Sequence, residues 1–231
     1  MFRTELIPVI IDTHVHESKY SFDSFLDLET SIKLAKLIGL DGICITNHEN
    51  NHLRDEIGDS AKINGVLVIV GSEILTHEGD ILTFGLKDMP NKMISARELL
   101  TLVKKHGGAA VAAHPFRNNN RGMGENMRKV SHLLTGIESF NGSTLPHHNL
   151  QSYTLATELN IPSLGASDAH RPERLGMYAT KFYNTIRDHK DFIEALKVGN
   201  YHPVMRKNGI YENINYFYEE NITSDNEMAF L

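Results

Sequence analysis

Short apolar runs rich in valine and isoleucine alternate with longer amphipathic stretches, and this alternation limits the possible folds most strongly. The runs predict strands over Pro8–Thr13, Gly42–Thr46, Val66–Val70, Asp80–Gly85, Ala109–Ala113, Gly136–Phe140, Pro162–Ala166 and Ala179–Phe182. The stretches between them predict helices over Asp27–Ile38, Ser95–His106, Met123–Leu134, Leu150–Leu159 and Asp188–Val198. Such alternation is typical of a parallel sheet. About seven units in one domain favour an α/β fold closed into a distorted barrel over an open sheet.

The length of 231 residues suits one domain. We see no internal repeat and no linker, and we expect a single barrel domain over residues 1–204. Residues 205–231 are polar and acidic, which predicts a C-terminal tail or surface appendage. The aromatic residues of this segment could instead pack on the domain or on a second subunit, so the oligomeric state stays open.

Composition disfavours several classes of protein. There is no run of about 18 apolar residues and no signal peptide, so we expect a cytoplasmic protein without a membrane partner. A net charge of −6 disfavours a large nucleic-acid-binding surface but allows a small phosphorylated substrate. The lone cysteine, Cys44, lies in an apolar run and is expected to be a buried hydrophobic residue.

The first predicted strand ends in Asp12, His14 and His16. Alternate residues of a strand share one face, so we expect these three side chains to point the same way. Two imidazoles spaced by one residue can bind one metal ion, and an adjacent aspartate can orient them. Because a single His-x-His pattern is common by chance, this motif alone is weak evidence for a metal site.

Ligand-type residues recur at four further strand ends: His48 and Glu49, Glu73, His114, and Asp168 with His170. The carboxyl ends of parallel barrel strands gather at one mouth, where function usually resides. Histidines and carboxylates together suit zinc, manganese or iron. The alternative, separate capping or surface residues, does not explain five such ends in one chain. We therefore predict a shared site for divalent metal ions.

The ordered motifs DTHVH, TNH, GSE, AHP and SDAH resemble those of the PHP (polymerase and histidinol phosphatase) domain family over roughly residues 10 to 183. The resemblance implies a TIM-like, distorted (β/α)7 barrel with two or three divalent ions that hydrolyses phosphate esters. Among the branches of the family, the short chain is most similar to the small stand-alone phosphoesterases.

The resemblance also implies which residues bind each ion. His14, His16, Glu73 and Asp168 would hold the first ion, and Glu73 with His114 the second. His48 and His170 would hold a third ion with the help of an acidic residue that we assign to Asp23.

Two positions depart from the family pattern. Asn47 replaces the usual aspartate before His48, and Asn141 stands where a histidine or cysteine would bind the second ion, with Glu138 three residues earlier. An amide oxygen is a poor zinc ligand. The second ion could therefore be weakly bound, be manganese or iron, or be completed by His147, His148 or water.

The predicted reaction is attack of a metal-bound hydroxide on a phosphate mono- or diester, since bound cations lower the pKa of water from about 16 toward about 7. Arg117 is the first candidate for binding phosphate and Arg171 the second. Asp12, Asp168 or a bound water could protonate the leaving group. We expect a small nucleotide or sugar phosphate as substrate, and the end of a nucleic acid is a less favoured one.

Two other functions remain open at this point. An amidohydrolase-type C–N hydrolase also begins with His-x-His, but it expects a lone aspartate at the late strand and often a bridging lysine. A metal-binding module without turnover is kept open by the missing ligand at position 141.

Overall fold

All eight predicted strands are present in the computed structural model, which describes residues 8–214. The strands are β1 (Val9–Val15), β2 (Gly42–Ile45), β3 (Ser60–Ile63), β4 (Val66–Val70), β5 (Ser72–Thr76), β6 (Gly79–Phe84), β7 (Ala109–Ala112), β8 (Gly136–Asn141), β9 (Ser163–Ala166), β10 (Tyr178–Phe182), β11 (Tyr201–Lys207) and β12 (Ile210–Asn213). Strands β3, β5, β11 and β12 were not predicted, because they are short or mostly polar.

Four of the five predicted helices are α-helices: α1 (Leu28–Leu37), α3 (Ala96–Lys105), α4 (Pro146–Glu158) and α5 (His189–Val198). A short α2 (Arg54–Ile57) was not predicted. The α-helix expected over Met123–Leu134 is wrong in type, since this segment forms the 3-10 turns η1 (Gly124–Lys129) and η2 (Ser131–Leu133). Gly124 has φ of 51°, which an α-helix does not allow. A third 3-10 turn is η3 (Pro172–Arg174).

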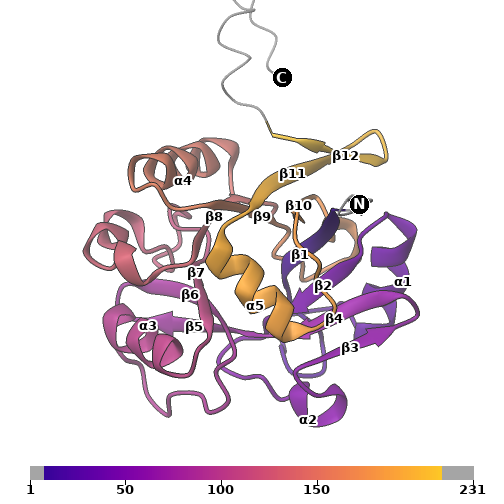
Figure 1. Ribbon diagram of the computed structural model, residues 1–231, viewed down its shortest axis with the longest axis horizontal. Helices are drawn as coiled ribbons and strands as arrows, with labels where there is room; N and C mark the ends of the chain where they lie inside the picture. The colour runs from indigo at the N-terminus through magenta and orange to yellow at the C-terminus, as the bar shows by residue number, and fades with distance from the viewer. Residues whose placement is uncertain (1–7, 215–231) are drawn as a thin grey trace, which may run out of the picture.

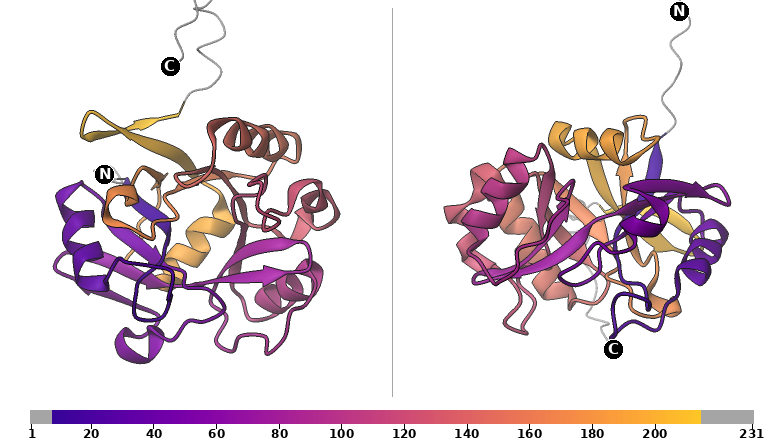
Figure 2. Two further views of the ribbon diagram at one scale, coloured as in Figure 1. Left: turned by 180° about the vertical axis from the view of Figure 1, so that it is seen from behind. Right: turned by 90° about the horizontal axis from the view of Figure 1, so that it is seen from below.

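The strands form two sheets (Figure 1, and from two other sides in Figure 2). The larger has the order β12-β11-β10-β1-β2-β4-β3 and the smaller the order β5-β6-β7-β8-β9. Strand β4 leads into β5 at Gly71, where a Cβ atom would lie 2.6 Å from the Phe84 ring. At the other junction, Val15 and Ala169 form a parallel bridge. The structure thus confirms one mixed α/β domain, whereas closure into a distorted (β/α)7 barrel is not confirmed.

Strand β6 runs against its neighbours, contrary to the expected parallel sheet. It pairs antiparallel with both β5 and β7, while β1–β2, β2–β4, β7–β8 and β8–β9 are parallel. Only a tight turn joins β5 to β6, and parallel strands would need a longer crossover connection. As a result the first residues of β6, not its last, lie beside the carboxyl end of β7.

Helix α5 covers one end of the strands, and Figure 1 shows it lying across them. Its N-cap Asp188 accepts hydrogen bonds from the amides of Lys190 and Asp191, and Gly199 ends it in the left-handed region. Phe192 and Leu196 are fully buried in one cluster with apolar residues of β1, β2, β4, β6, β7 and β9. With α5 on one side, the ligand-type residues gather at the opposite ends of the parallel strands.

The hairpin β11–β12 continues the larger sheet beyond residue 204, the expected boundary of the domain. Residues 215–231 of the expected tail lie outside the described residues, which end at position 214. Within residues 8–214, no helix is long and apolar enough to cross a membrane. Cys44 is fully buried, as predicted.

Candidate metal centre

Strand β1 delivers two imidazoles to one point. His14 and His16 are both fully buried, and their Nε2 atoms lie 2.9 Å apart. The end of β1 is fixed against the segment after β9, because the amide of His16 donates to the carbonyl of Ala169. This contact brings the neighbouring Asp168 to the histidine pair.

Four donor atoms from His14, His16, Glu73 and Asp168 enclose a small space. Glu73 Oε2 lies 3.5 Å and 3.4 Å from the Nε2 atoms of His14 and His16, and Asp168 Oδ1 lies 3.4 Å and 3.3 Å from the same two atoms. Ligands held roughly 2.0 to 2.2 Å from one tetrahedral ion would lie roughly 3.3 to 3.6 Å apart. The four nitrogen–oxygen distances and the chemistry of the donor set therefore fit a zinc-sized divalent ion, whereas the two Nε2 atoms, 2.9 Å apart, lie closer than this spacing.

Glu73 extends this group towards strand β7. Its Oε1 atom lies 2.8 Å from His114 Nε2, and both residues are buried. Glu73 Oε2 and His114 Nδ1 have no hydrogen-bond partner within the described chain. His114 and Asp168 also have positive φ values, 28° and 52°, a backbone conformation that costs free energy and is concentrated at functional sites.

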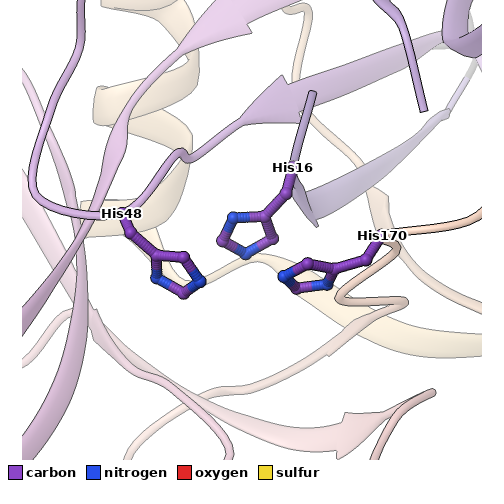
Figure 3. Close-up of side chains that lie close together, drawn as sticks. All are labelled: His16, His48 and His170. Carbon is purple, nitrogen blue, oxygen red and sulfur yellow. The ribbon is translucent and has the colours of Figure 1, made fainter. Parts of the chain in front are cut away.

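A third group lies nearer the surface, where the rings of His16, His48 and His170 converge (Figure 3). The ring centroids of His16 and His170 are 4.1 Å apart, and those of His16 and His48 are 4.4 Å apart. Asp23 Oδ2 lies 3.1 Å from His48 Nε2 and 3.3 Å from His170 Nε2. All eight residues predicted to bind metal thus lie in one continuous cluster.

The protonation states suit cation binding. Burial lowers the pKa of His16 to about 4, so this ring is neutral near neutral pH. Burial also lowers the pKa of His14, but Asp168, Glu138 and Glu73 outweigh it and raise this pKa well above its usual value. Burial opposes ionisation of Glu73 and Asp168, yet the surrounding histidines hold the pKa of both carboxyls well below the usual range. A bound cation would take the place of the proton on His14.

Comparisons with known proteins indicate the family of this chain. A family model described as PHP-associated matches residues 146–201. The uncharacterized protein MJ1587 of Methanocaldococcus jannaschii is 32% identical over 140 residues, which cover 56% of this chain and 80% of that protein.

The chain belongs to the PHP domain family.

Solved structures share the fold of this PHP domain at low identity. One is a two-domain protein from Bacteroides vulgatus containing a predicted PHP-like metal-dependent phosphoesterase, with a TM-score of 0.64, 19% identity, and coverage of 88% of this chain and 66% of that one. Another is the lesion-specific endonuclease PfuEndoQ from Pyrococcus furiosus, with a TM-score of 0.64, 19% identity, and coverage of 83% and 56%. At this identity the likeness concerns the fold alone.

Asp12 does not point into the cluster. Its carboxylate accepts hydrogen bonds from the amides of Ser167 and Gly176, at 2.9 Å and 3.0 Å, and burial raises its pKa to about 6. Asp12 was expected to orient His14 or His16, and the β1–β2 register shifts between Asp12 and Val15. Asp12 therefore holds the segment that carries Asp168 rather than the imidazoles.

Glu138, which lies within β8, takes the orienting role instead. Its Oε1 atom lies 2.9 Å from His14 Nδ1, and its Oε2 atom accepts from the His114 amide at 2.7 Å. A carboxylate on one ring nitrogen fixes the tautomer and leaves the other nitrogen for a ligand. The sequence alone does not predict this role for Glu138, because the residue does not lie at the end of its strand.

Asn47 and Asn141, which depart from the family pattern, both donate a side-chain amide hydrogen bond to a buried glutamate. Asn47 Nδ2 donates to Glu17 at 2.9 Å, and Asn47 Oδ1 accepts from the Glu17 amide at 3.0 Å. Asn141 Nδ2 donates to Glu138 at 3.0 Å. An aspartate in either place would set two carboxylates against each other. The side-chain amides of Asn47 and Asn141 therefore suit the buried carboxylates of Glu17 and Glu138, which an aspartate would repel.

Of the two arginine candidates, Arg117 reaches the cluster. Its Nη2 atom donates to Asp168 Oδ2 at 2.5 Å and to Asn141 Oδ1 at 2.7 Å, while Nε donates to Thr144 at 3.0 Å. The guanidinium of Arg171 instead lies over the Phe25 ring, 4.7 Å from its centroid. Arg117 is thus the arginine that contacts a predicted ion ligand.

Two further residues beside the cluster were not predicted, Asp80 and Arg121. Asp80 is fully buried at the start of β6, and Arg121 donates to both of its carboxylate oxygens, at 2.7 Å and 3.1 Å. Asp80 lies at the start of a strand and not at its carboxyl end, because β6 is antiparallel to its neighbours. The run His-Glu-Gly-Asp directly after β5 was the only signal for it.

Proposed function

We propose that this PHP domain is a metal-dependent phosphoesterase that hydrolyses a phosphate mono- or diester, with a small nucleotide or sugar phosphate preferred. The observation that carries the proposal is the set of four buried donor atoms from His14, His16, Glu73 and Asp168. Histidines and carboxylates in this arrangement suit zinc, manganese or iron. In this proposal the two sheets together act as a distorted (β/α)7 barrel with the cluster at its mouth.

Two or three divalent ions would share these ligands. His14, His16, Glu73 and Asp168 would hold the first, Glu73 and His114 the second, and His48, His170 and Asp23 the third. When bound, such ions lower the pKa of water and neutralise phosphoryl oxygens. The protein supplies a fixed, buried donor set, and Glu138 orients His14 within it.

Arg117 is proposed to bind a phosphate oxygen. Its Nε and Nη2 atoms are already hydrogen-bonded, whereas its Nη1 atom donates to no group within residues 8–214. The side chain is 19% exposed, so Nη1 can meet a substrate at the mouth. A planar guanidinium matches phosphate oxygens well.

Neither aspartate suggested as general acid suits that role. Asp168 is ionised near neutral pH, since its pKa lies well below the usual range, and Asp12 is bonded to backbone amides away from the cluster. We therefore assign protonation of the leaving group to water.

The test is metal analysis joined to a substrate panel. Protein purified without chelator should contain at least two equivalents of zinc, manganese or iron. It should release phosphate from nucleotides, sugar phosphates or a generic phosphodiester, and chelator should abolish the activity. Hydrolysis of a cyclic amide instead would indicate a C–N hydrolase. Bound metal without turnover on any substrate would indicate a binding module, and activity confined to DNA or RNA ends would indicate a nuclease.

A further inference from the structure

The loop between β1 and α1 exposes two phenylalanines beside the metal cluster. Phe22 is 97% exposed and Phe25 is 70% exposed, whereas the other phenylalanines and tyrosines of residues 8–214 are buried or half-buried. Asp23, the proposed ligand of the third ion, lies between them in the sequence. An aromatic ring kept in water gives up the burial that stabilises most phenylalanines, and apolar side chains exposed together often mark a binding surface. Their exposure next to an ion ligand therefore indicates a binding role.

Hydrogen bonds hold the backbone of this loop in one conformation. The carboxylate of Glu17 accepts from the amides of Lys19 and Tyr20, at 2.8 Å and 3.1 Å. The amide of Phe25 donates to the carbonyl of His170 at 2.8 Å. A surface whose shape is fixed in advance loses little conformational entropy when it binds a ligand. The loop therefore presents the two phenylalanines from a fixed backbone.

Arg171 holds the Phe25 ring from one side. Its guanidinium carbon lies 4.7 Å from the ring centroid, within the range of a cation–π contact. Within residues 8–214 this guanidinium has no hydrogen bond or ion pair, so the ring is its partner. Because Phe25 is largely exposed, its other face is open to a ligand. We call Phe22, Phe25 and Arg171 the aromatic patch, which combines apolar rings with a positive charge.

The aromatic patch lies within reach of a phosphoester bound at the ions. Arg171 directly follows His170, a proposed ligand of the third ion, and Phe25 is hydrogen-bonded to the same histidine. Asp168 Oδ1, which belongs to the buried four-atom set, lies 3.5 Å from His170 Nδ1. A phosphate held by these ligands would therefore leave the organic part of its ester beside the Phe25 ring.

A nucleobase suits this surface better than a sugar does. Phenylalanine side chains have no hydrogen-bonding atoms, so they offer no partner to the hydroxyl groups of a sugar. Asp23, the acid between them, already faces His48 and His170, 3.1 Å and 3.3 Å away. Every base, by contrast, has a flat π face that stacks on an aromatic ring.

We propose that the aromatic patch binds the base of the substrate, and that the substrate is therefore a nucleotide and not a sugar phosphate. Phe25 is the main stacking ring, and Arg171 is a positioning residue that holds it. Because any base can stack, the patch selects nucleotides without distinguishing one base from another. This inference rests on the proposed function, since it takes the patch to serve a phosphoester bound at the ions.

The first test compares adenosine monophosphate with ribose phosphate, which lacks the base. Phe25→Ala should raise the KM of the nucleotide at least about tenfold with kcat unchanged, because only stacking is lost. The KM of ribose phosphate should not change. Phe25→Tyr keeps an aromatic ring and should retain the wild-type KM, while Arg171→Gln should raise the KM of the nucleotide less than Phe25→Ala does. The matched control is Leu37→Ala, an exposed apolar residue on α1.

The second test needs no turnover. NMR follows the ring signals of the phenylalanines in the wild type, and those of Phe25 are identified by their absence from Phe25→Tyr. Adenosine monophosphate should shift these signals and ribose phosphate should not, because only the nucleotide has a base to stack. This shift in a protein that hydrolyses neither compound would overturn the proposed reaction but support the binding site, so the two failures are distinguishable.

Three results would overturn the inference. The first is an unchanged KM of the nucleotide in Phe25→Ala, and the second is an equal rise in the KM of both compounds, which would mean that Phe25 only maintains the loop. The third is an equal shift of the Phe25 signals, or none, with the two compounds. Because the Phe25 side chain is exposed, its replacement should leave the fold intact, and the NMR test on the wild type does not depend on it.

Discussion

The two sides of the metal cluster follow different rules. On the side of β1, β2 and β9, the histidine ligands lie at or just beyond the carboxyl ends of strands, as in His16, His48 and His170, and only Asp23 comes from a loop. On the side of β6, β7 and β8, the nearby charged groups come from the start of a strand, from within a strand and from a loop, as in Asp80, Glu138 and Arg121. The first side keeps all its metal ligands and departs from the family motifs only at Asn47, beside His48, while the second has lost one ligand and is surrounded by new contacts. The comparison suggests that the first ion is the essential one and the second the adaptable one.

The largest effect is expected from His16→Ala, because His16 belongs both to the four-atom set and to the outer group of histidines. Turnover on the best phosphoester should fall by about a thousandfold or more, since several kcal/mol of charge stabilisation would be lost. The matched control is His132→Ala, an exposed histidine in η2, which should keep full activity. Activity of His16→Ala near that of the control, with both proteins folded by circular dichroism, would refute the mechanism.

Removing the ions should destabilise the protein, because the buried donor atoms would then face one another without a cation. Ions present at 100 to 1,000 times their Kd contribute about 3 to 4 kcal/mol, which for this length lowers Tm by about 5 to 15 °C when chelator is added. Differential scanning calorimetry with and without chelator measures the shift. Glu73→Gln should show a smaller shift, since it lacks the bridging carboxylate but keeps the ligands of the third ion, and an equal shift in that variant would place the ions elsewhere.

The ligands at the strand ends of the first side could be predicted, because each is signalled by the residues next to it in the sequence. An apolar run ends, a histidine or carboxylate follows, and the parallel topology brings such ends together. The position of Asp80 was not predicted, because the direction of β6 depends on the tight turn after β5 and on pairing with β7, which is distant in sequence. Asp12 was assigned to the imidazoles, whereas its carboxylate accepts hydrogen bonds from the amides of Ser167 and Gly176, which are distant in sequence. In both cases a contact between distant segments decides where the side chain points.

The contrast between Asp12 and Glu138 can be tested directly. Glu138→Gln should weaken metal binding by about 10- to 100-fold, because the carboxylate orients His14. Asp12→Asn should leave metal affinity unchanged and lower the free energy of unfolding by about 1 to 3 kcal/mol, since its oxygens accept backbone amides. Competition with a chromophoric chelator gives the affinities, and urea denaturation gives the stabilities. The reverse pattern would restore the orienting role to Asp12.

The smallest effect should come from Phe22, which is 97% exposed and directly precedes Asp23 at the outer edge of the cluster. Stacking of a nucleobase on an aromatic ring contributes about 1 to 3 kcal/mol. If nucleotides are the preferred substrates, Phe22→Ala should raise their KM about 5- to 10-fold with kcat unchanged. The KM of sugar phosphates, which lack a base, should not move. Ile210→Ala, an exposed apolar residue on β12, is the control for general loss of apolar surface. An equal rise in KM for both substrate classes would mean that Phe22 maintains the loop around Asp23 and does not bind a base. Substrate selection would then be assigned to the side of β6, β7 and β8.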